Sequence, residues 1–283
     1  MQKKTKTFIS IAALAMAILL LICGVIAGMV VIPQTREKGK RYQETTRFVN
    51  RNEKIQMIAH RGLSGLALEN TTAAFIQAGH HNYYGIETDV LITKDGQFIL
   101  CHDNTLSRIA GVDILVEQTD FATLRALRFP NSYTHSDEKN HALASVDEYL
   151  SICKEYGKHA VLELKSTFSA EKITELVELI KAFEYLDCTT FISFSQSNLL
   201  ALRAQYPSVS AQYIVQNCTQ EDERFMIENK LDADLCWVSV TRSRVRRLKR
   251  AGLKINCWTV DGAACATLMQ DYGVDQITTN ILE

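Results

Sequence analysis

Residues 84–103 read YGIETDVLITKDGQFILCHD and combine an apolar strand pattern with a tight reversal of the chain. Tyr84–Asp89 is typical of a buried strand. The Asp95-Gly96 pair is a strong signal for a hairpin turn. We therefore expect Phe98–Cys101 to return antiparallel to residues 89–92, which would bring His102 back beside Asp89.

On both sides of this stretch, strand-like apolar runs alternate with amphipathic helical patterns. The expected strands are Ile55–Ala59, Tyr84–Asp89, His159–Leu164, Thr190–Phe194, Val209–Val215, Ala233–Val238, Leu253–Thr259 and Val274–Thr278. The expected helices are Thr71–His81, Ser145–Tyr156, Ala170–Tyr185, Ser197–Gln205, Glu221–Asn229, Arg242–Ala251 and Gly262–Asp271. Eight strands alternating with helices predict an α/β fold of the TIM (β/α)8 barrel type over residues 55–283. The irregular residues 104–141 (Asn104–His141) are predicted to form a short insertion on its rim.

The N-terminus has a different character. Phe8–Ile32 contains no charged residue, and a helix of this length, about 37 Å, would span a bilayer. It is too long for a signal-peptide core and lacks a small-residue cleavage site. We expect a single N-terminal transmembrane helix at 8–32, a linker at 33–54 and a single-pass location in the cell membrane. Basic residues flank the span on both sides, so the side that carries the barrel stays open.

Composition narrows the possible partners. The formal net charge is −1 and no basic run is interleaved with aromatic residues, so nucleic acid is not an expected partner. Seven of the eight cysteines follow the apolar segment, with no CxxC pair and no metal-ligand spacing. This odd set weakly favours a reducing compartment.

Polar residues collect where the expected strands end, which is where active sites of such barrels lie. These residues are His60, Arg61, Glu87, Asp89, Glu163, Lys165 and Trp258, and the hairpin adds His102. Glu87 and Asp89 are two positions apart and therefore share one face of their strand. Together with Glu163 they would be costly to bury without a cation, and oxygen ligands suit Mg²⁺ or Ca²⁺ better than zinc.

The remaining members of the set suit a phosphate substrate. Arg61 and Lys165 would stabilise negative charge on phosphate oxygens. His60 and His102 are suited to proton transfer near neutral pH. Each residue alone has an ordinary structural explanation, such as a satisfied polar histidine, a surface ion pair or a core tryptophan. Their convergence on strand ends favours an active site.

Several motifs in this order resemble the signature of the glycerophosphodiester phosphodiesterase family, which is related to the phosphatidylinositol-specific phospholipases C. They are Ala59-His60-Arg61-Gly62, Glu69-Asn70-Thr71, Ile86-Glu87-Thr88-Asp89-Val90, Thr93-Lys94-Asp95-Gly96, His102-Asp103, Glu163-Leu164-Lys165, Ser193-Phe194 and Trp258-Thr259-Val260. The resemblance covers residues 56–280 and implies a TIM barrel that hydrolyses glycerophosphodiesters to glycerol phosphate and an alcohol. Three departures are Leu68, where the family usually has Pro, Asn280, where it usually has Asp, and the absence of the Pro expected before Ser145.

The resemblance also implies roles for individual residues. Glu87, Asp89 and Glu163 would hold the divalent metal, and His60 and His102 would be the general acid–base pair. Four further residues would bind substrate: Arg61 and Lys165 through phosphate, Glu69 by ordering the pocket, and Trp258 by packing on the glycerol. By similarity to the phospholipases, His60 would deprotonate the glycerol 2-hydroxyl and His102 would protonate the departing alcohol.

Two alternatives accompany this prediction. A membrane-tethered barrel would instead act on lysophospholipids or on glycerophosphate polymers, with specificity lying in the rim insertion. A third hypothesis, from another class, is a catalytically silent barrel that serves as a membrane-bound binding module. The complete set of catalytic-type residues argues against the silent module.

Overall fold

A computed structural model describes residues 44–51, 55–129 and 141–283 of the chain. The predicted anchor at 8–32 and most of the predicted linker at 33–54 lie outside the described residues. Among the helices that are described, none is both long enough and apolar enough to cross a membrane.

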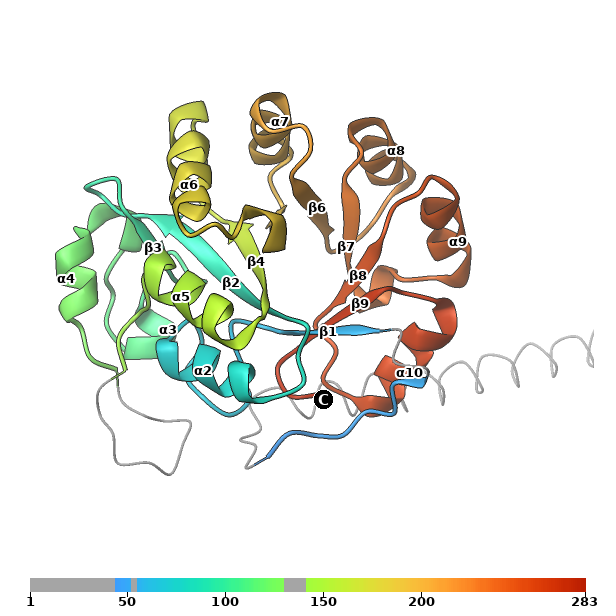
Figure 1. Cartoon of the computed structure of the whole chain (residues 1–283), viewed down its shortest axis with the longest axis horizontal. Coiled ribbons are helices and arrows are strands. Elements are labelled where there is room, and N and C mark those ends of the chain that lie inside the picture. The colour runs from blue at the N-terminus through green and yellow to red at the C-terminus, as the bar shows by residue number, and fades with distance from the viewer. Residues whose placement is uncertain (1–43, 52–54, 130–140) are drawn as a thin grey trace, which may run out of the picture. The chain divides into compact units, whose positions relative to one another are not determined.

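The described strands form one closed sheet. Their order is β1-β9-β8-β7-β6-β5-β4-β2-β3, and β1 also pairs with β2. The strands are β1 Gln56–Ala59, β2 Gly85–Ile92, β3 Phe98–Leu100, β4 His159–Leu164, β5 Thr189–Ser193, β6 Ser210–Val215, β7 Asp232–Cys236, β8 Ile255–Trp258 and β9 Gln276–Thr279. All neighbours pair in parallel except β3, which is antiparallel to β2. The predicted (β/α)8 barrel is confirmed (Figure 1).

Helices alternate with the strands and lie around the outside of the barrel (Figure 1). They are α2 Thr72–His80, α3 Ser107–Ala110, α4 Phe121–Ala126, α5 Val146–Tyr156, α6 Ala170–Ala182, α7 Gln196–Gln205, α8 Gln220–Asn229, α9 Arg242–Arg250 and α10 Ala263–Tyr272, with short 3-10 turns η2 Val116–Gln118, η3 Leu186–Cys188 and η4 Trp237–Ser239. Six helices begin with a Ser or Thr side chain that accepts a bond from the first turn: Thr71, Ser145, Ser169, Ser195, Thr219 and Thr241. Such caps satisfy amide groups that have no partner within the helix.

The hairpin has the predicted form. Val90 pairs with Leu100 and Ile92 with Phe98, while the Cys101 amide donates to the Asp89 carbonyl at 3.0 Å. The chain can reverse tightly because Gly96 adopts a φ of +78°, a value that glycine tolerates without strain. His102 therefore lies beside Asp89, three residues before β2 ends at Ile92.

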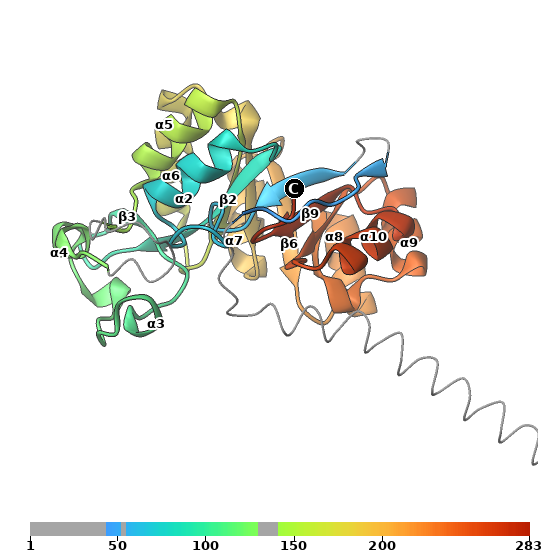
Figure 2. The same cartoon turned by 90° about the horizontal axis from the view of Figure 1, so that it is seen from below.

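The rim insertion has its own small core. Apolar side chains of α4, η2 and the segment before α3 pack against the hairpin, and they include Leu106, Val116, Leu124 and Phe129. Leu124 and Phe129 are at most 1% exposed, so these two apolar residues of the insertion close onto the barrel, whereas Val112 and Leu115 stay exposed. Figure 2 shows α3 and α4 together with β3 at one end of the domain.

Some boundaries differ from the predicted ones. The strand expected at Ala233–Val238 ends at Cys236, where the chain turns into η4. The helix expected at Ala170–Tyr185 ends at Ala182. Tyr185 instead leaves the helix so that its hydroxyl donates to the carbonyls of Cys153 and Lys158. Both differences arise because tertiary hydrogen bonds and turns override the local apolar pattern.

The residues just before β1 pair with the C-terminal residues. The Thr46 amide donates to the Ile281 carbonyl at 3.0 Å, and the Glu283 amide donates to the Thr46 carbonyl at 2.9 Å. Phe48 is buried, with 7% exposure. This part of the predicted linker therefore packs against the barrel.

Candidate active site at the carboxyl ends of the strands

Three carboxylates converge where β2 pairs with the carboxyl end of β4. Asp89 and Glu163 are direct partners in the parallel pairing of these strands, and Glu87 is two residues earlier on the same face. One oxygen from each of the three lies within 4.8 Å of the others. Their exposures are 3% for Glu87, 1% for Asp89 and 8% for Glu163.

Two cations partly balance these three acids. The Arg61 Nε lies 3.5 Å from Asp89 Oδ2, and Lys165 Nζ lies 3.5 Å from Asp89 Oδ1 and 3.2 Å from Glu163 Oε1. The Arg61 amide also donates to Glu87 Oε2 at 2.8 Å. Three carboxylates therefore outnumber the two cations in a buried place, and full ionisation of all three would be costly without a further cation.

The pKa values of the acids reflect this crowding. Burial, followed by repulsion from Asp89 and Glu163, raises the pKa of Glu87 well above its usual range. Burial and the charge of Asp89 raise the pKa of Glu163 to about 8. Burial also acts to raise the pKa of Asp89, but the nearby Arg61 and Lys165 hold it below its usual range.

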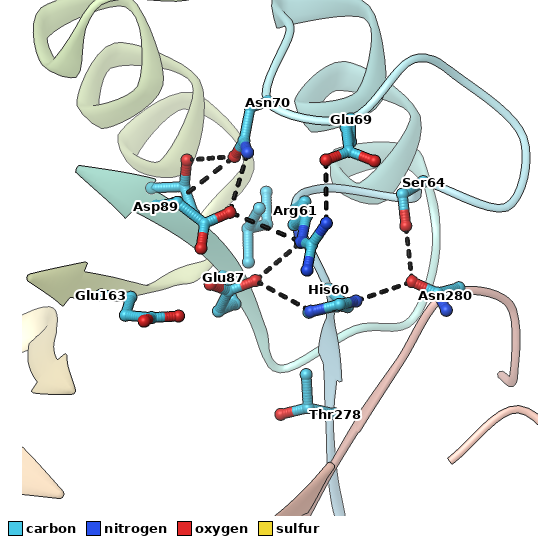
Figure 3. A network of polar contacts seen from close by, with 12 residues as sticks. His60, Arg61, Ser64, Glu69, Asn70, Glu87, Asp89, Glu163, Thr278 and Asn280 are labelled. Carbon is cyan, nitrogen blue, oxygen red and sulfur yellow. Dashed lines mark hydrogen bonds and ion pairs between the residues drawn. The ribbon is translucent and has the colours of Figure 1, made fainter. Parts of the chain in front are cut away.

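His60 lies at the end of β1, directly beside this cluster (Figure 3). Its Nε2 is 4.0 Å from Glu87 Oε2, and its Nδ1 is 2.7 Å from Asn280 Oδ1. Burial and the nearby Arg61 charge lower the pKa of His60 to about 3. The imidazole is therefore neutral near pH 7.

His102 approaches from the hairpin and is more open, with a side-chain exposure of 31%. Its Nδ1 lies 2.5 Å from Asp103 Oδ1. Burial lowers the pKa of His102, whereas the carboxylates of Asp89 and Asp103 act to raise it. The two histidines thus have different partners, an amide for His60 and a carboxylate for His102.

Glu69 links the barrel to the rim insertion. It accepts from Arg61 at 2.8 Å and from both terminal nitrogens of Arg108 at 2.7 Å. Arg108 also donates to Asp103 at 2.6 Å, so it connects Glu69 with the partner of His102. The sequence patterns did not single out Arg108, because the insertion in which it lies has no regular spacing of apolar residues that would predict its position.

Asn70 is a second residue to which the sequence assigned no role. It is 1% exposed; its Nδ2 donates to Asp89 Oδ2 at 2.8 Å and its Oδ1 accepts from Thr88 at 2.7 Å. Figure 3 shows the Asn70 side chain in contact with Asp89. The Glu69-Asn70-Thr71 motif was the available signal for this role.

Trp258 ends β8 and packs against an apolar cluster inside the barrel, formed by Ile58, Val161, Ile192 and Ile214. Its Nε1 donates to the Asp234 carbonyl at 3.2 Å. The ring of Phe194, which follows β5, meets it edge-on with centroids 5.5 Å apart. The structure therefore places Trp258 at the strand-end side of the barrel core.

Known proteins are similar to this chain in sequence and in fold. The model of the glycerophosphoryl diester phosphodiesterase family matches residues 60–283. YhdW of Bacillus subtilis is 30% identical over 237 residues, covering 80% of this chain and 94% of YhdW. A glycerophosphodiester phosphodiesterase of Caldanaerobacter subterraneus is 27% identical over 232 residues, covering 80% of this chain and 94% of that protein.

A solved structure extends this likeness to three dimensions. It is a phosphodiesterase of Oleispira antarctica in complex with the product sn-glycerol-3-phosphate. It superposes with a TM-score of 0.74 at 26% identity, over 81% of this chain and 94% of that one. With its barrel, its motifs and a family match over most of its length, the chain belongs to the glycerophosphodiester phosphodiesterase family, and the predicted enzyme class is confirmed.

Proposed function

We propose that this protein hydrolyses glycerophosphodiesters to glycerol phosphate and a free alcohol by metal-dependent, histidine-assisted catalysis. The observation that carries the proposal is the buried cluster of Glu87, Asp89 and Glu163, with cations and histidines at its edge. The product bound to the Oleispira antarctica relative supports the same class of substrate.

A divalent cation, Mg²⁺ or Ca²⁺, fits this cluster. Three carboxylates face two cationic side chains, and all the candidate ligand atoms are oxygens, which hard cations prefer. Glu87, Asp89 and Glu163 would hold the ion, which would supply positive charge for the phosphate oxygens.

Arg61 and Lys165 are placed to bind the phosphate next to this ion. Both reach Asp89 within 3.5 Å, so their charged groups lie at the edge of the carboxylate cluster. Glu69 holds Arg61 from the other side at 2.8 Å and would thereby order the substrate pocket. Trp258 would supply an apolar wall for the glycerol carbons.

The two histidines would move the protons. His60 Nε2 would take the proton of the glycerol 2-hydroxyl, whose oxygen attacks phosphorus while the bond to the alcohol breaks. His102 would give its proton to the departing alcohol, and the Asp103 carboxylate favours the protonated form that this role requires. In the second step His102 would deprotonate water, the attack of which opens the cyclic phosphate, and His60 would return its proton to the 2-oxygen.

Turnover of glycerophosphocholine by the purified full chain tests this function. We expect release of glycerol phosphate that EDTA abolishes and that added Mg²⁺ or Ca²⁺ restores. His60→Ala and His102→Ala are each expected to lower kcat by about 10²–10⁴-fold, whereas His80→Ala on α2 serves as a histidine control. Near wild-type turnover in both active-site variants would refute the histidine mechanism.

A second candidate is action on lysophospholipids at a membrane that the apolar segment 8–32 would hold nearby. Its specific support is two exposed apolar side chains that follow strand ends: Phe194 after β5, 46% exposed, and Val238 after β7, 57% exposed. An acyl chain would cover such residues. Val238→Ser should then reduce turnover of lysophosphatidylcholine micelles and spare glycerophosphocholine, with Leu200→Ser on α7 as control. Equal effects on both substrates would exclude this specificity.

A further inference from the structure

Asn280 follows β9 and lies against the side of His60 that faces away from the carboxylates (Figure 3). Its Oδ1 is 2.7 Å from His60 Nδ1 and accepts from the Ser64 hydroxyl at 2.7 Å. The His60 amide also donates to the carbonyl of Thr279 at 2.8 Å. The backbone and the ring of His60 are therefore both fixed by consecutive residues at the end of β9.

Asp261 determines which way the Asn280 amide faces. Its Oδ2 accepts from Asn280 Nδ2 at 2.6 Å, and its Oδ1 accepts from the Asn280 backbone amide at 2.7 Å and from the Thr279 hydroxyl at 3.1 Å. A flipped amide would place Oδ1 against a carboxylate oxygen, with no proton between them. The Nδ2 group must therefore face Asp261, which leaves Oδ1 for His60.

This orientation fixes the proton on the imidazole. An amide oxygen only accepts hydrogen bonds, so His60 Nδ1 must be the protonated nitrogen of the neutral ring. Its Nε2 then carries the free lone pair, and this is the atom that faces Glu87 at 4.0 Å. The other tautomer would put two lone pairs in contact at 2.7 Å.

We propose that Asp261 and Asn280 act as positioning residues that hold His60 in its Nδ1-protonated tautomer and direct the Nε2 lone pair toward the reacting groups. The tautomer of His60 follows from these contacts alone, and only the expected effect on kcat rests on the proposed function. An aspartate at position 280 would not replace the amide, because its oxygen would face the Asp261 carboxylate at about the 2.6 Å of the present contact. The contact between positions 261 and 280 needs one hydrogen-bond donor and one acceptor.

Nitrogen-15 NMR of the full chain labelled at histidine observes the tautomer without turnover. The signals of His60 are identified among the seven histidines by their absence from His60→Ala. We expect the wild-type protein to show a protonated Nδ1 and an unprotonated Nε2. A wild-type ring protonated on Nε2 would overturn the proposal, whether or not the protein hydrolyses any substrate.

Kinetics of the variants test the positioning. Asn280→Ala should lower kcat by about 10–100-fold with little change in KM, and should mix the two tautomers in the spectrum. Asn229→Ala on α8 is the matched control, because its amide donates to the Phe225 carbonyl at 2.9 Å, away from the site. An Asn280→Ala protein with an unchanged tautomer and unchanged kcat would contradict the proposal.

Exchange of the pair provides a test that does not depend on the alanine variant folding. Asn280→Asp alone should lower kcat, because two carboxylates then face each other. Adding Asp261→Asn restores one donor and one acceptor, and should recover most of kcat and the Nδ1-protonated signal. A double variant no better than the single one would show that position 280 acts without Asp261, and would overturn the pairing.

Discussion

Glu163 is the member of the carboxylate cluster most open to water, with 8% exposure. Glu163→Gln keeps its shape and removes one negative charge, so fewer anionic ligands remain for a cation. We expect Mg²⁺ or Ca²⁺ to raise the Tm of the wild-type protein, since an ion bound only to the folded state stabilises it.

The same ions should raise the Tm of Glu163→Gln much less, and its kcat should fall by at least tenfold. Differential scanning calorimetry with EDTA and with each metal measures the first effect. Glu175→Gln on α6, at an exposed carboxylate, is the control and should respond to metal as the wild type does. An undiminished shift in the Glu163 variant would remove this residue from the metal site.

Asp234 on β7 gives the fold a pH dependence that is separate from the carboxylate cluster. It is 2% exposed and accepts from Asn256 Nδ2 at 2.7 Å, and burial raises its pKa to about 7. Because the unfolded chain ionises near pH 4, the folded state holds the extra proton between about pH 4 and 7. Stability should therefore decline as pH rises through this window.

Asp234→Asn removes that proton equilibrium while keeping the acceptor for Asn256. Between pH 5 and pH 8, the free energy of unfolding measured in urea should fall by a few kcal/mol less in this variant than in the wild type. Asp271→Asn, at an exposed position on α10, should behave as the wild type. Identical pH slopes for Asp234→Asn and wild type would show that Asp234 does not titrate on unfolding.

Strand-end residues were predictable from the sequence because a parallel barrel brings all its carboxyl ends to one rim. Glu87, Asp89 and Glu163 follow from that rule. Arg108 and Asp261 do not, because Arg108 lies on the short helix α3, which no apolar pattern predicted, and Asp261 lies in the loop after β8. Asn280 was visible only as a departure from a motif, and its partner Asp261 gives that departure a physical reason.

At the scale of elements, the β2–β3 hairpin links backbone geometry to chemistry. Gly96→Ala would force a non-glycine residue into a φ of +78°, which costs about 1–2 kcal/mol. It should also displace β3 and His102, and so lower kcat several-fold, since small misplacements of a catalytic group slow reaction.

Gly157→Ala is the matched control for this change. Gly157 has a φ of +62°, and an added Cβ would meet nothing within 4 Å. It ends α5, away from the hairpin, so its variant should lose similar stability in urea denaturation with no change in kcat. If both variants kept wild-type kcat, the hairpin would not determine the position of His102.

The hairpin was predictable because Asp-Gly turns and strand patterns are local signals. The exact ends of β7 and α6 were not, since they depend on distant bonds such as that of Tyr185 to Cys153. Local pattern thus predicts which elements exist better than where they stop.

For the whole molecule, the segment before β1 closes the barrel domain by pairing with its last residues. Phe48 is 7% exposed, so Phe48→Ala should lower the free energy of unfolding by about 3 kcal/mol and leave kcat unchanged. Val49→Ala, at a residue 77% exposed, should change neither. Urea denaturation measures the stability of the two variants, and turnover measures their kcat. Equal stability of the two variants would show that the pairing of this segment contributes little to the free energy of unfolding.

The barrel as a whole followed from the alternation of strands and helices, which is a property of the entire chain. The packing of residues 44–51 did not, because their polar composition resembles a linker and their partners are more than 200 positions away. Only the closure of the sheet brings them together.

The pairing of β1 with β9, which closes the sheet, also affects when the protein becomes active during its synthesis. By the time residue 275 has left the ribosome, both histidines and all three acids have been made, yet β1 has no partner on its β9 side. His60 still lacks the Thr279 and Asn280 groups that fix its backbone and ring. A nascent chain that lacks β9 should therefore be inert toward glycerophosphodiesters, and hydrolysis should begin only once β9 and Asn280 have been synthesised and have paired with β1.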